Sequence, residues 1–280
     1  MFDALRRFAP VVLLMILPTF VAASAPERIT IKGSDTMVIL VQRWTELYPN
    51  KKGLEFQVTG GGSGTGIAAL INGTTDICSS SRPIKPAEVR QLKEKYQYRG
   101  MEVRVARDGL AVYVHKNNSV KQLTIEQIRL IFTGQVRNWK DVGGADKPII
   151  LYSRENNSGT YEFFKEHVLL KQDFAAEAQH MAGTAALINA VSKDPNAIGF
   201  GGAAYAANVR PLGVAKEKGS AYVTPTEASI LSGEYPISRF LYFYLNERPK
   251  GTEKAFIDWV ISPAGQKVVK DVGYYPIKKF

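Results

Sequence analysis

Apolar positions along the chain follow strand-like and helix-like spacings in turn. Short β-rich or alternating runs predict strands at residues 28–32, 54–59, 75–78, 109–115, 148–153, 197–200 and 240–246. Apolar residues at helical spacing predict helices at residues 37–48, 67–72, 86–96, 124–132, 160–169, 185–192, 252–261 and 263–271. This alternation indicates an α/β fold whose mostly parallel sheets are covered by helices.

A chain of 280 residues can form one large or two medium domains. No long Pro- or Ser-rich linker and no solenoid-type repeat divides the sequence. If there are two lobes, the chain must cross between them in short extended segments. Residues 103–109 and 234–240 are the candidates for these crossings.

The N-terminus has the layout of a secretory signal peptide. Arg6 and Arg7 precede an apolar run at residues 8–23 that ends in small residues. The run is short for a membrane-spanning helix, which needs about 20 apolar residues. We expect residues 1–25 to be a signal peptide cleaved after Ala23 or nearby, and an uncleaved anchor is the alternative. The protein is then exported, to the periplasm or outside the cell.

Cys78 is the only cysteine, so the exported chain has no internal disulfide and depends on its core for stability. Because no cysteine lies near the cleavage region, we expect no lipid anchor of the bacterial lipoprotein type. Cys78 lies in an apolar run and is best explained as a small core residue.

The net charge of +10 suits nucleic acid, an acidic surface or an anionic ligand, and it also fits a solvated basic surface. Lysine and arginine are spread along the chain and no nucleic-acid module is recognisable, so we expect no nucleic-acid partner. His115, His167 and His180 are widely separated and lack metal-ligand spacing. We therefore expect neither a metal nor a cofactor.

Three segments place hydroxyl side chains and backbone N–H groups at the start of a predicted helix. Ser63-Gly64-Thr65 and Ser158-Gly159-Thr160 share one tripeptide, and Gly33-Ser34-Asp35-Thr36 is a variant. The first N–H groups of a helix lack intrahelical partners, the helix dipole adds about half a positive charge, and glycine allows close approach. Ordinary N-capping explains one such segment. Three of them at the carboxyl ends of strands predict a shared anion site.

Two charged residues, Arg154 and Asp76, make the prediction of an anion site more specific. Arg154 lies just before the second tripeptide, and its planar guanidinium can bind a tetrahedral oxyanion through two hydrogen bonds. A surface ion pair, for example to Glu155, is the alternative. Asp76 closes a short apolar run, and a carboxylate beside an anion favours a ligand that still carries a proton. Monohydrogen phosphate does so, because the second phosphate pKa is about 6, whereas sulfate would be rejected. Capping of Ser79 or Ser80 is the other explanation of Asp76.

Enzyme and nucleotide-binding motifs do not fit the glycine-rich residues 60–66. No lysine follows them as a Walker A motif requires, and Asp76 comes too soon for the ribose contact of a dinucleotide site. Neither Ser63 nor Ser158 has the surroundings of a Gly-x-Ser-x-Gly nucleophile elbow. We therefore expect a binding protein and not an enzyme, with a phosphatase of the same fold as the alternative.

At these residues the chain resembles the phosphate-binding proteins of ABC phosphate importers, the PstS family. The resemblance covers nearly the whole chain after the leader. The segments that carry the resemblance are residues 33–36, 61–65, 76–82, 154–160 and 197–200. The most specific of them is the Arg-x-x-x-Ser-Gly-Thr motif at residues 154–160. The resemblance implies a two-lobed periplasmic binding protein of type II. Each lobe would be a mostly parallel sheet flanked by helices, and the lobes would close on phosphate about a hinge.

The resemblance also assigns the ligand contacts. The residues it points to are Thr36, Ser63, Asp76, Arg154, Ser158, Gly159 and Thr160, with Ser34 and Ser81 as further candidates. In this assignment Asp76 accepts the phosphate proton and Arg154 pairs with the anion. Many family members have Asp-Gly before Ser-Gly-Thr, where this chain has Asn156 and Asn157. With Asn156 we expect a more positive site and less secure selectivity against other oxyanions.

The sequence thus predicts a monomeric, non-enzymatic carrier that binds inorganic phosphate and hands it to the membrane permease of an ABC importer. Residues 26–106 and 237–280 would form lobe 1, and residues 107–236 would form lobe 2. The alternative is a binding protein for another oxyanion, or a phosphate sensor or surface protein of the same fold.

Overall fold

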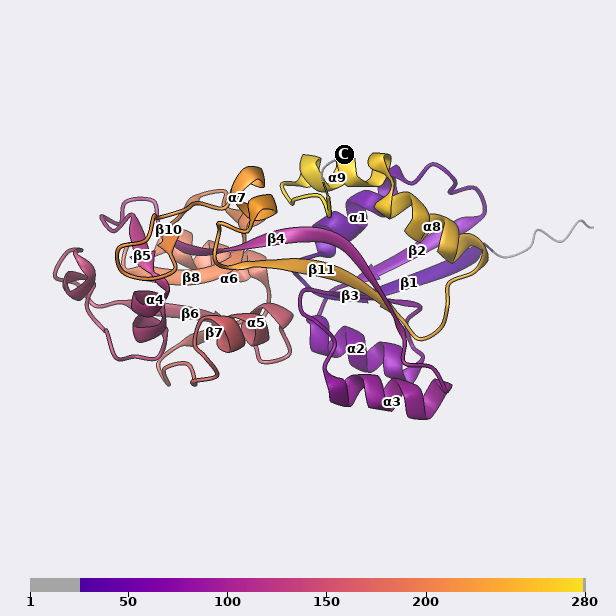
Figure 1. Ribbon diagram of the computed structural model, residues 1–280, viewed down its shortest axis with the longest axis horizontal. Coiled ribbons are helices and arrows are strands. Elements are labelled where there is room, and N and C mark those ends of the chain that lie inside the picture. The colour runs from indigo at the N-terminus through magenta and orange to yellow at the C-terminus, as the bar shows by residue number, and fades with distance from the viewer. Residues whose placement is uncertain (1–25, 279–280) are drawn as a thin grey trace, which may run out of the picture.

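The computed structural model describes residues 26–278, which form two α/β lobes (Figure 1). The expected signal peptide at residues 1–25 lies outside the described residues. The helices are α1 (Val38–Leu47), α2 (Ser63–Asn72), α3 (Pro86–Tyr96), α4 (Ile125–Phe132), α5 (Gly159–His167), α6 (Thr184–Lys193), α7 (Glu227–Ser232), α8 (Gly251–Ile261) and α9 (Pro263–Val272). The strands are β1 (Glu27–Gly33), β2 (Leu54–Thr59), β3 (Ile77–Ser80), β4 (Met101–His115), β5 (Gln122–Thr124), β6 (Ile150–Arg154), β7 (Gln179–Met181), β8 (Ala197–Gly202), β9 (Val209–Pro211), β10 (Gly213–Ala215) and β11 (Ser238–Leu245). Between residues 26 and 278, no helix has the length and apolar character needed to cross a bilayer.

A single nine-stranded sheet runs through both lobes of the described chain, in the order β2-β1-β3-β11-β4-β8-β6-β7, with β9 beside β4. In the first lobe β1 pairs in parallel with β2 and β3, and in the second β6 pairs in parallel with β7 and β8. Between these parallel parts, β11 and β4 run antiparallel to each other and to their outer neighbours β3 and β8. The predicted two-lobed α/β fold is confirmed, and the difference is that antiparallel strands join the two parallel parts into one mixed sheet.

The start of α2 differs from the sequence prediction. The glycine-rich residues 60–66 predict a turn, yet α2 already begins at Ser63. Gly62 has a φ of 92°, a conformation that glycine adopts without strain, and it ends the turn there. Gly66 lies inside the helix, where a methyl group would meet Lys32 O at 2.6 Å and Cys78 Sγ at 3.0 Å. The glycines therefore let α2 pack closely on β1 and β3, so that its N-terminus lies at the carboxyl ends of these strands.

The two long strands β4 and β11 pass from one lobe to the other (Figure 1). On β4, Ala106 packs in the core of the first lobe and Leu110 in the core of the second. Ile237, directly before β11, belongs to the second-lobe core, and Leu241 on β11 belongs to the first. On the basis of this change of core, we propose that the lobes divide between Ala106 and Leu110 and between Ile237 and Leu241, close to the boundaries at 106/107 and 236/237 that the sequence predicts.

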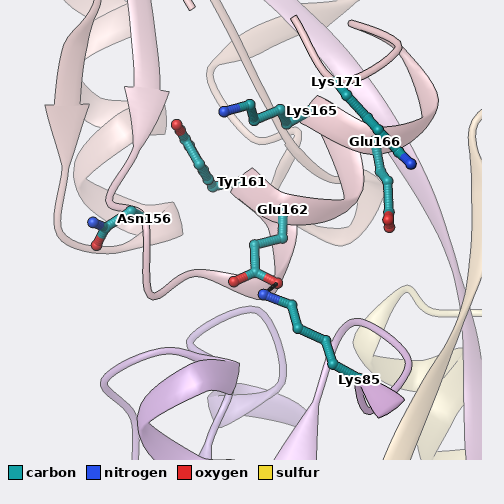
Figure 2. A pocket seen from close by; sticks show the side chains of 7 residues that line it. All are labelled: Lys85, Asn156, Tyr161, Glu162, Lys165, Glu166 and Lys171. Atoms are coloured by element: carbon teal, nitrogen blue, oxygen red, sulfur yellow. Dashed lines mark ion pairs between the residues drawn. The ribbon is translucent and has the colours of Figure 1, made fainter. Parts of the chain in front are cut away.

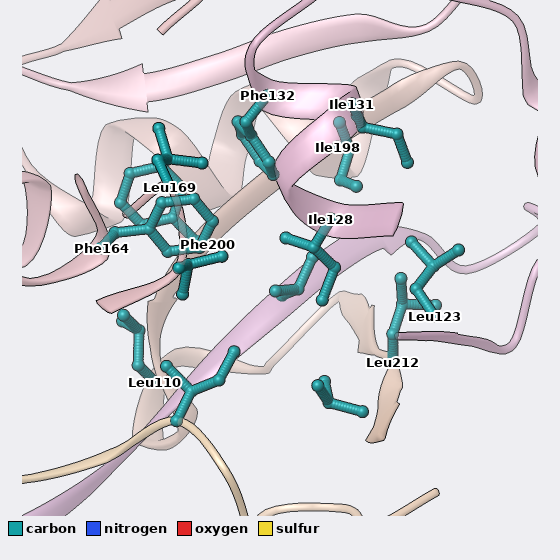
Figure 3. Close-up of a cluster of buried hydrophobic side chains, with 14 of the residues drawn as sticks. Leu110, Leu123, Ile128, Ile131, Phe132, Phe164, Leu169, Ile198, Phe200 and Leu212 are labelled. Atoms are coloured by element: carbon teal, nitrogen blue, oxygen red, sulfur yellow. The ribbon is translucent and has the colours of Figure 1, made fainter. Parts of the chain in front are cut away.

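Stacked aromatic rings form the centre of the second-lobe core (Figure 3). Phe164 from α5 stacks on Phe200 from β8 with ring centroids 3.9 Å apart, and Phe132 from α4 meets both rings edge-on. Each such ring pair contributes about 0.5–1.5 kcal/mol beyond its burial. The packing of Phe164 on Phe200 holds α5 against the sheet, so the N-terminus of α5 has a fixed position at the edge of the lobe.

Candidate functional site

Hydroxyl groups from the predicted helix starts meet where the two lobes come together. The Thr36 and Thr160 hydroxyl oxygens lie 2.9 Å apart, and those of Ser63 and Ser81 lie 3.3 Å apart. A methyl group on Gly159 would lie 2.4 Å from Ser63 Oγ and 2.9 Å from Ser81 Oγ. The N-termini of α2 and α5 therefore approach each other across the lobes, and only a glycine at position 159 permits this distance.

Local hydrogen bonds fix this group of residues. The members that are buried are Ser34, Thr36, Ser63, Ser81, Arg154, Ser158, Gly159 and Thr160. Ser158 Oγ caps α5 by accepting from the Thr160 and Tyr161 N–H groups, so ordinary capping is one of its roles. Ser63 Oγ accepts from the Ser81 N–H, and the Ser34 N–H donates to Ser79 O. We call Thr36, Ser63, Ser81 and Ser158–Thr160 the hydroxyl cluster.

Arg154 pairs with Asp35 of the first lobe and not with Glu155. Its Nη2 donates to Asp35 Oδ2 at 2.9 Å, and its Nη1 donates to Thr184 Oγ1 at 2.8 Å. Burial lowers the pKa of Arg154, and the Asp35 carboxylate opposes this shift. Asp35 Oδ1 also accepts from the Gly61 N–H. Arg154 thus has a carboxylate partner, Asp35, although Asn156 cannot supply one. The expectation that Asn156 makes the site more positive is corrected, because the Asp35 carboxylate balances the charge of Arg154.

The structure does not bring Asp76 to the hydroxyl cluster. Asp76 precedes β3, is exposed, and accepts from the Thr30 N–H at 2.7 Å and from Thr30 Oγ1 at 2.8 Å. Ser79 lies at the end of β3 that is near the cluster, because it pairs with Gly33 of β1. Three strand residues span about 10 Å, so Asp76 lies near the opposite end of this short strand. The interpretation of Asp76 as the proton acceptor placed it at the wrong end of β3.

Sequence reasoning missed two buried charges beside the cluster, Asp108 on β4 and Arg239 on β11. These residues are directly paired in the β4–β11 ladder, and Arg239 Nη2 lies 2.8 Å from Asp108 Oδ2. Arg239 also donates to Thr160 Oγ1 at 3.0 Å and to Ser81 O at 2.9 Å, so it touches both lobes. Burial raises the pKa of Asp108, against the effect of Arg239. The available signal was that Asp108 and Arg239 each lie in one of the two extended segments proposed as lobe crossings, residues 103–109 and 234–240.

The sequence matches a family model described as a PBP superfamily domain over residues 21–264. The phosphate-binding protein PstS of Pseudomonas aeruginosa is 38% identical over 266 residues, which cover 88% of this chain and 81% of that protein. The phosphate-binding protein PstS of Staphylococcus saprophyticus is 35% identical over 258 residues, covering 88% of this chain and 79% of the relative. The chain belongs to the PstS family.

Solved structures agree with this family assignment. A candidate phosphate ABC transporter substrate-binding protein from Clostridium perfringens, with bound phosphate, superposes with a TM-score of 0.81 at 30% identity and covers 90% of this chain and 100% of its own. An ABC-type phosphate transport receptor from Vibrio cholerae has a TM-score of 0.71 at 28% identity, covering 88% and 99%. The two-lobed fold of this PstS-family chain is therefore that of periplasmic phosphate-binding proteins.

The chemistry of the site is that of an anion receptor. Hydroxyl groups, helix N-termini and two guanidinium groups gather at one place, and all of them are able to donate hydrogen bonds to an oxyanion. Within residues 26–278, no group of three or more His, Cys, Asp or Glu side chains is arranged to hold a metal ion. A further contact across the lobes, from the Gly64 N–H to Asn157 O at 3.0 Å, keeps the two helix starts together.

Proposed function

We propose that this chain binds inorganic phosphate between its lobes and delivers it to the membrane permease of an ABC importer, without catalysing a reaction. The observation that carries this proposal is the meeting of the α2 and α5 N-termini, where Gly159 leaves room for Ser63 and Ser81. Two helix dipoles directed at one point favour an anion there. A group bound at this point touches both lobes, so binding and lobe closure become one event.

The proposed ligand contacts follow from this geometry. They are Thr36, Ser63, Arg154, Ser158, Gly159 and Thr160, with Ser34 and Ser81 as further contacts. The serines and threonines donate from their hydroxyl groups, and the helix starts donate from their N–H groups. Arg154 is already aligned by Asp35 and Thr184, so its guanidinium loses little freedom when an anion binds.

The carboxylate that we propose for recognising the phosphate proton is Asp108, in place of Asp76. Asp108 is fully buried beside Arg239, which contacts Thr160 of the cluster. Its Oδ1 has no partner at full hydrogen-bond geometry, although the nearby Ala203 N–H favours the charged form. A carboxylate oxygen that lacks a donor favours monohydrogen phosphate over sulfate, which has no proton to give.

The further parts of the proposal concern the state of the protein. We propose a monomer that is exported to the periplasm or the cell exterior after its signal peptide is removed, and that has no lipid anchor. A carrier for a different oxyanion, or a phosphate sensor of the same fold, remains the second candidate because hydroxyl and N–H donors suit any tetrahedral anion.

Calorimetric titration of residues 24–280 with phosphate, arsenate and sulfate at neutral pH tests the proposal. We expect saturable phosphate binding with one site per chain and no binding of sulfate. Absence of phosphate binding would contradict the proposal, and sulfate binding of equal strength would remove the selective role of a carboxylate.

A further inference from the structure

A groove of about 570 Å³ lies beside the hydroxyl cluster, at the junction of the lobes (Figure 2). The first lobe contributes Lys85 to its lining, and the second lobe contributes the other residues. These are Asn156, Tyr161, Glu162, Lys165, Glu166 and Lys171. The side chains of Lys85 and Glu162 point toward each other across this groove and form an ion pair (Figure 2).

Glu162 forms ion pairs with two cations of the opposite lobe. Its Oε2 lies 2.8 Å from Arg82 Nε and 2.8 Å from Lys85 Nζ. The Arg82 side chain is 5% exposed and that of Glu162 is 23% exposed, so this pair is largely shielded from solvent. The Lys85 side chain is 53% exposed, and its pair with Glu162 is correspondingly weaker.

The positions of these residues in the chain connect them to the candidate ligand site. Arg82 directly follows Ser81, and Glu162 lies two residues after Thr160 in the first turn of α5. Ser81 and Gly159 meet across the lobes, as the 2.9 Å approach to Ser81 Oγ shows. Any movement that separates Ser81 from the start of α5 must therefore also separate Arg82 from Glu162.

When the lobes separate, Arg82 retains an ion-pair partner and Glu162 does not. Arg82 keeps a second carboxylate within its own lobe, because its Nη2 lies 2.7 Å from Glu88 Oε1. Burial by itself lowers the pKa of Arg82, but the Glu88 hydrogen bond and the charge of Glu162 raise it above its ordinary value. Opening leaves the Arg82–Glu88 pair intact and returns Glu162 to water. The Glu162 pair is thus specific to the closed arrangement.

We propose that Glu162 is a positioning residue whose ion pairs with Arg82 and Lys85 hold the lobes closed and slow the release of the bound anion. This inference rests on the proposed phosphate binding. Glu162 itself does not touch the ligand in this scheme. Its loss should therefore accelerate dissociation and leave the association rate unchanged, because an open chain admits phosphate with or without the pair.

The experiment compares Glu162→Gln with Glu166→Gln. Glu166 lies one turn further along α5 and lines the same groove, yet in the described part of the chain it forms no ion pair with the first lobe. Each variant is loaded with radiolabelled phosphate and mixed with excess unlabelled phosphate, and the remaining complex is measured by rapid filtration. We expect release on the order of tenfold faster for Glu162→Gln and unchanged for Glu166→Gln.

The dependence of the release rate on salt concentration shows whether the contact of Glu162 with Arg82 and Lys85 acts through its charge. Raising the sodium chloride concentration should accelerate release from the natural chain and have less effect on Glu162→Gln, because screening weakens only a pair that exists. Circular dichroism melting confirms that both variants are folded. Equal release rates for Glu162→Gln and the natural chain would overturn the inference alone. A natural chain that binds no phosphate would overturn the proposed function, and this inference with it.

Discussion

Arg154 of the second lobe donates a hydrogen bond to Asp35 of the first lobe over 2.9 Å. Asp35 is followed by Thr36, whose hydroxyl meets that of Thr160. The carboxylate that aligns the arginine therefore comes from the opposite lobe and arrives only when the lobes are together. This relationship couples the position of the arginine to closure of the lobes.

Replacing Arg154 by alanine should reduce phosphate affinity by about 100-fold, the equivalent of roughly 2–3 kcal/mol for charge-assisted hydrogen bonds. Calorimetry measures the affinity, and far-UV circular dichroism checks the fold. Arg137→Ala is the matched control, because Arg137 is an arginine of the same lobe with a side chain that is 73% exposed. If affinity survives in Arg154→Ala, the arginine only supports the structure.

Gly159→Ala should weaken phosphate binding by preventing the lobes from closing. The new methyl group would lie 2.4 Å from Ser63 Oγ and 2.8 Å from Ser63 Cβ, so rotation of the serine hydroxyl cannot relieve the clash. Opening of the lobes can relieve it, and the melting temperature should change little. Gly183→Ala is the control at another helix start of the second lobe, because a methyl group there meets nothing within 4 Å. Equal phosphate affinities for the two variants would count against the contact between α2 and α5.

Asp108→Asn should weaken phosphate binding and permit sulfate binding, whereas Asp76→Asn should change neither. The reason is that only Asp108 lies beside the cluster, while Asp76 binds Thr30 at the other end of β3. The Asp108 substitution leaves Arg239 without its counter-charge, so we also expect a loss of stability of about 3 kcal/mol. Competition calorimetry with both anions measures the selectivity. A change of selectivity in Asp76→Asn would restore the original interpretation of that residue.

Glu253→Gln should stabilise the protein at pH 8 and have no such effect at pH 4. Burial, with the charges of Asp76 and Glu247, raises the pKa of Glu253 from 4.5 to about 7. The folded state therefore binds the proton more tightly, and the corresponding stability is present below pH 4.5 and lost as the pH rises through 7. Because Glu253 is partly exposed, we expect a gain of about 1 kcal/mol at pH 8 after screening is allowed for. Urea unfolding at the two pH values measures it, and equal gains at both would contradict the shift.

The sequence predicts those elements whose signals are local. The strand at residues 54–59 and the helix at residues 86–96 have the predicted bounds, because the helix begins at Pro86 and ends before Gln97 in a left-handed conformation. The start of α2 was placed too late because Gly64 and Gly66 locally predict a turn. Their place in a helix is explained only by tertiary packing, of Gly66 on β1 and of Gly64 against Asn157.

Parts of the candidate site depend on pairing between distant residues, and the sequence cannot show that pairing. Asp108 and Arg239 are 131 positions apart and meet only through the β4–β11 register. Asp35 reaches Arg154 only because the lobes meet. Asp76 was misassigned for a local reason. The sequence predicts a strand at residues 75–78, whereas β3 spans Ile77–Ser80, so Asp76 lies before the strand and away from the hydroxyl cluster.

The most direct test of the central claim is a crystal structure of the chain with bound phosphate. The account predicts phosphate oxygens within hydrogen-bond distance of Thr36 and Ser63 from the first lobe and of Arg154 and Thr160 from the second. Phosphate bound to one lobe alone, or at a distance from the start of α5, would contradict it.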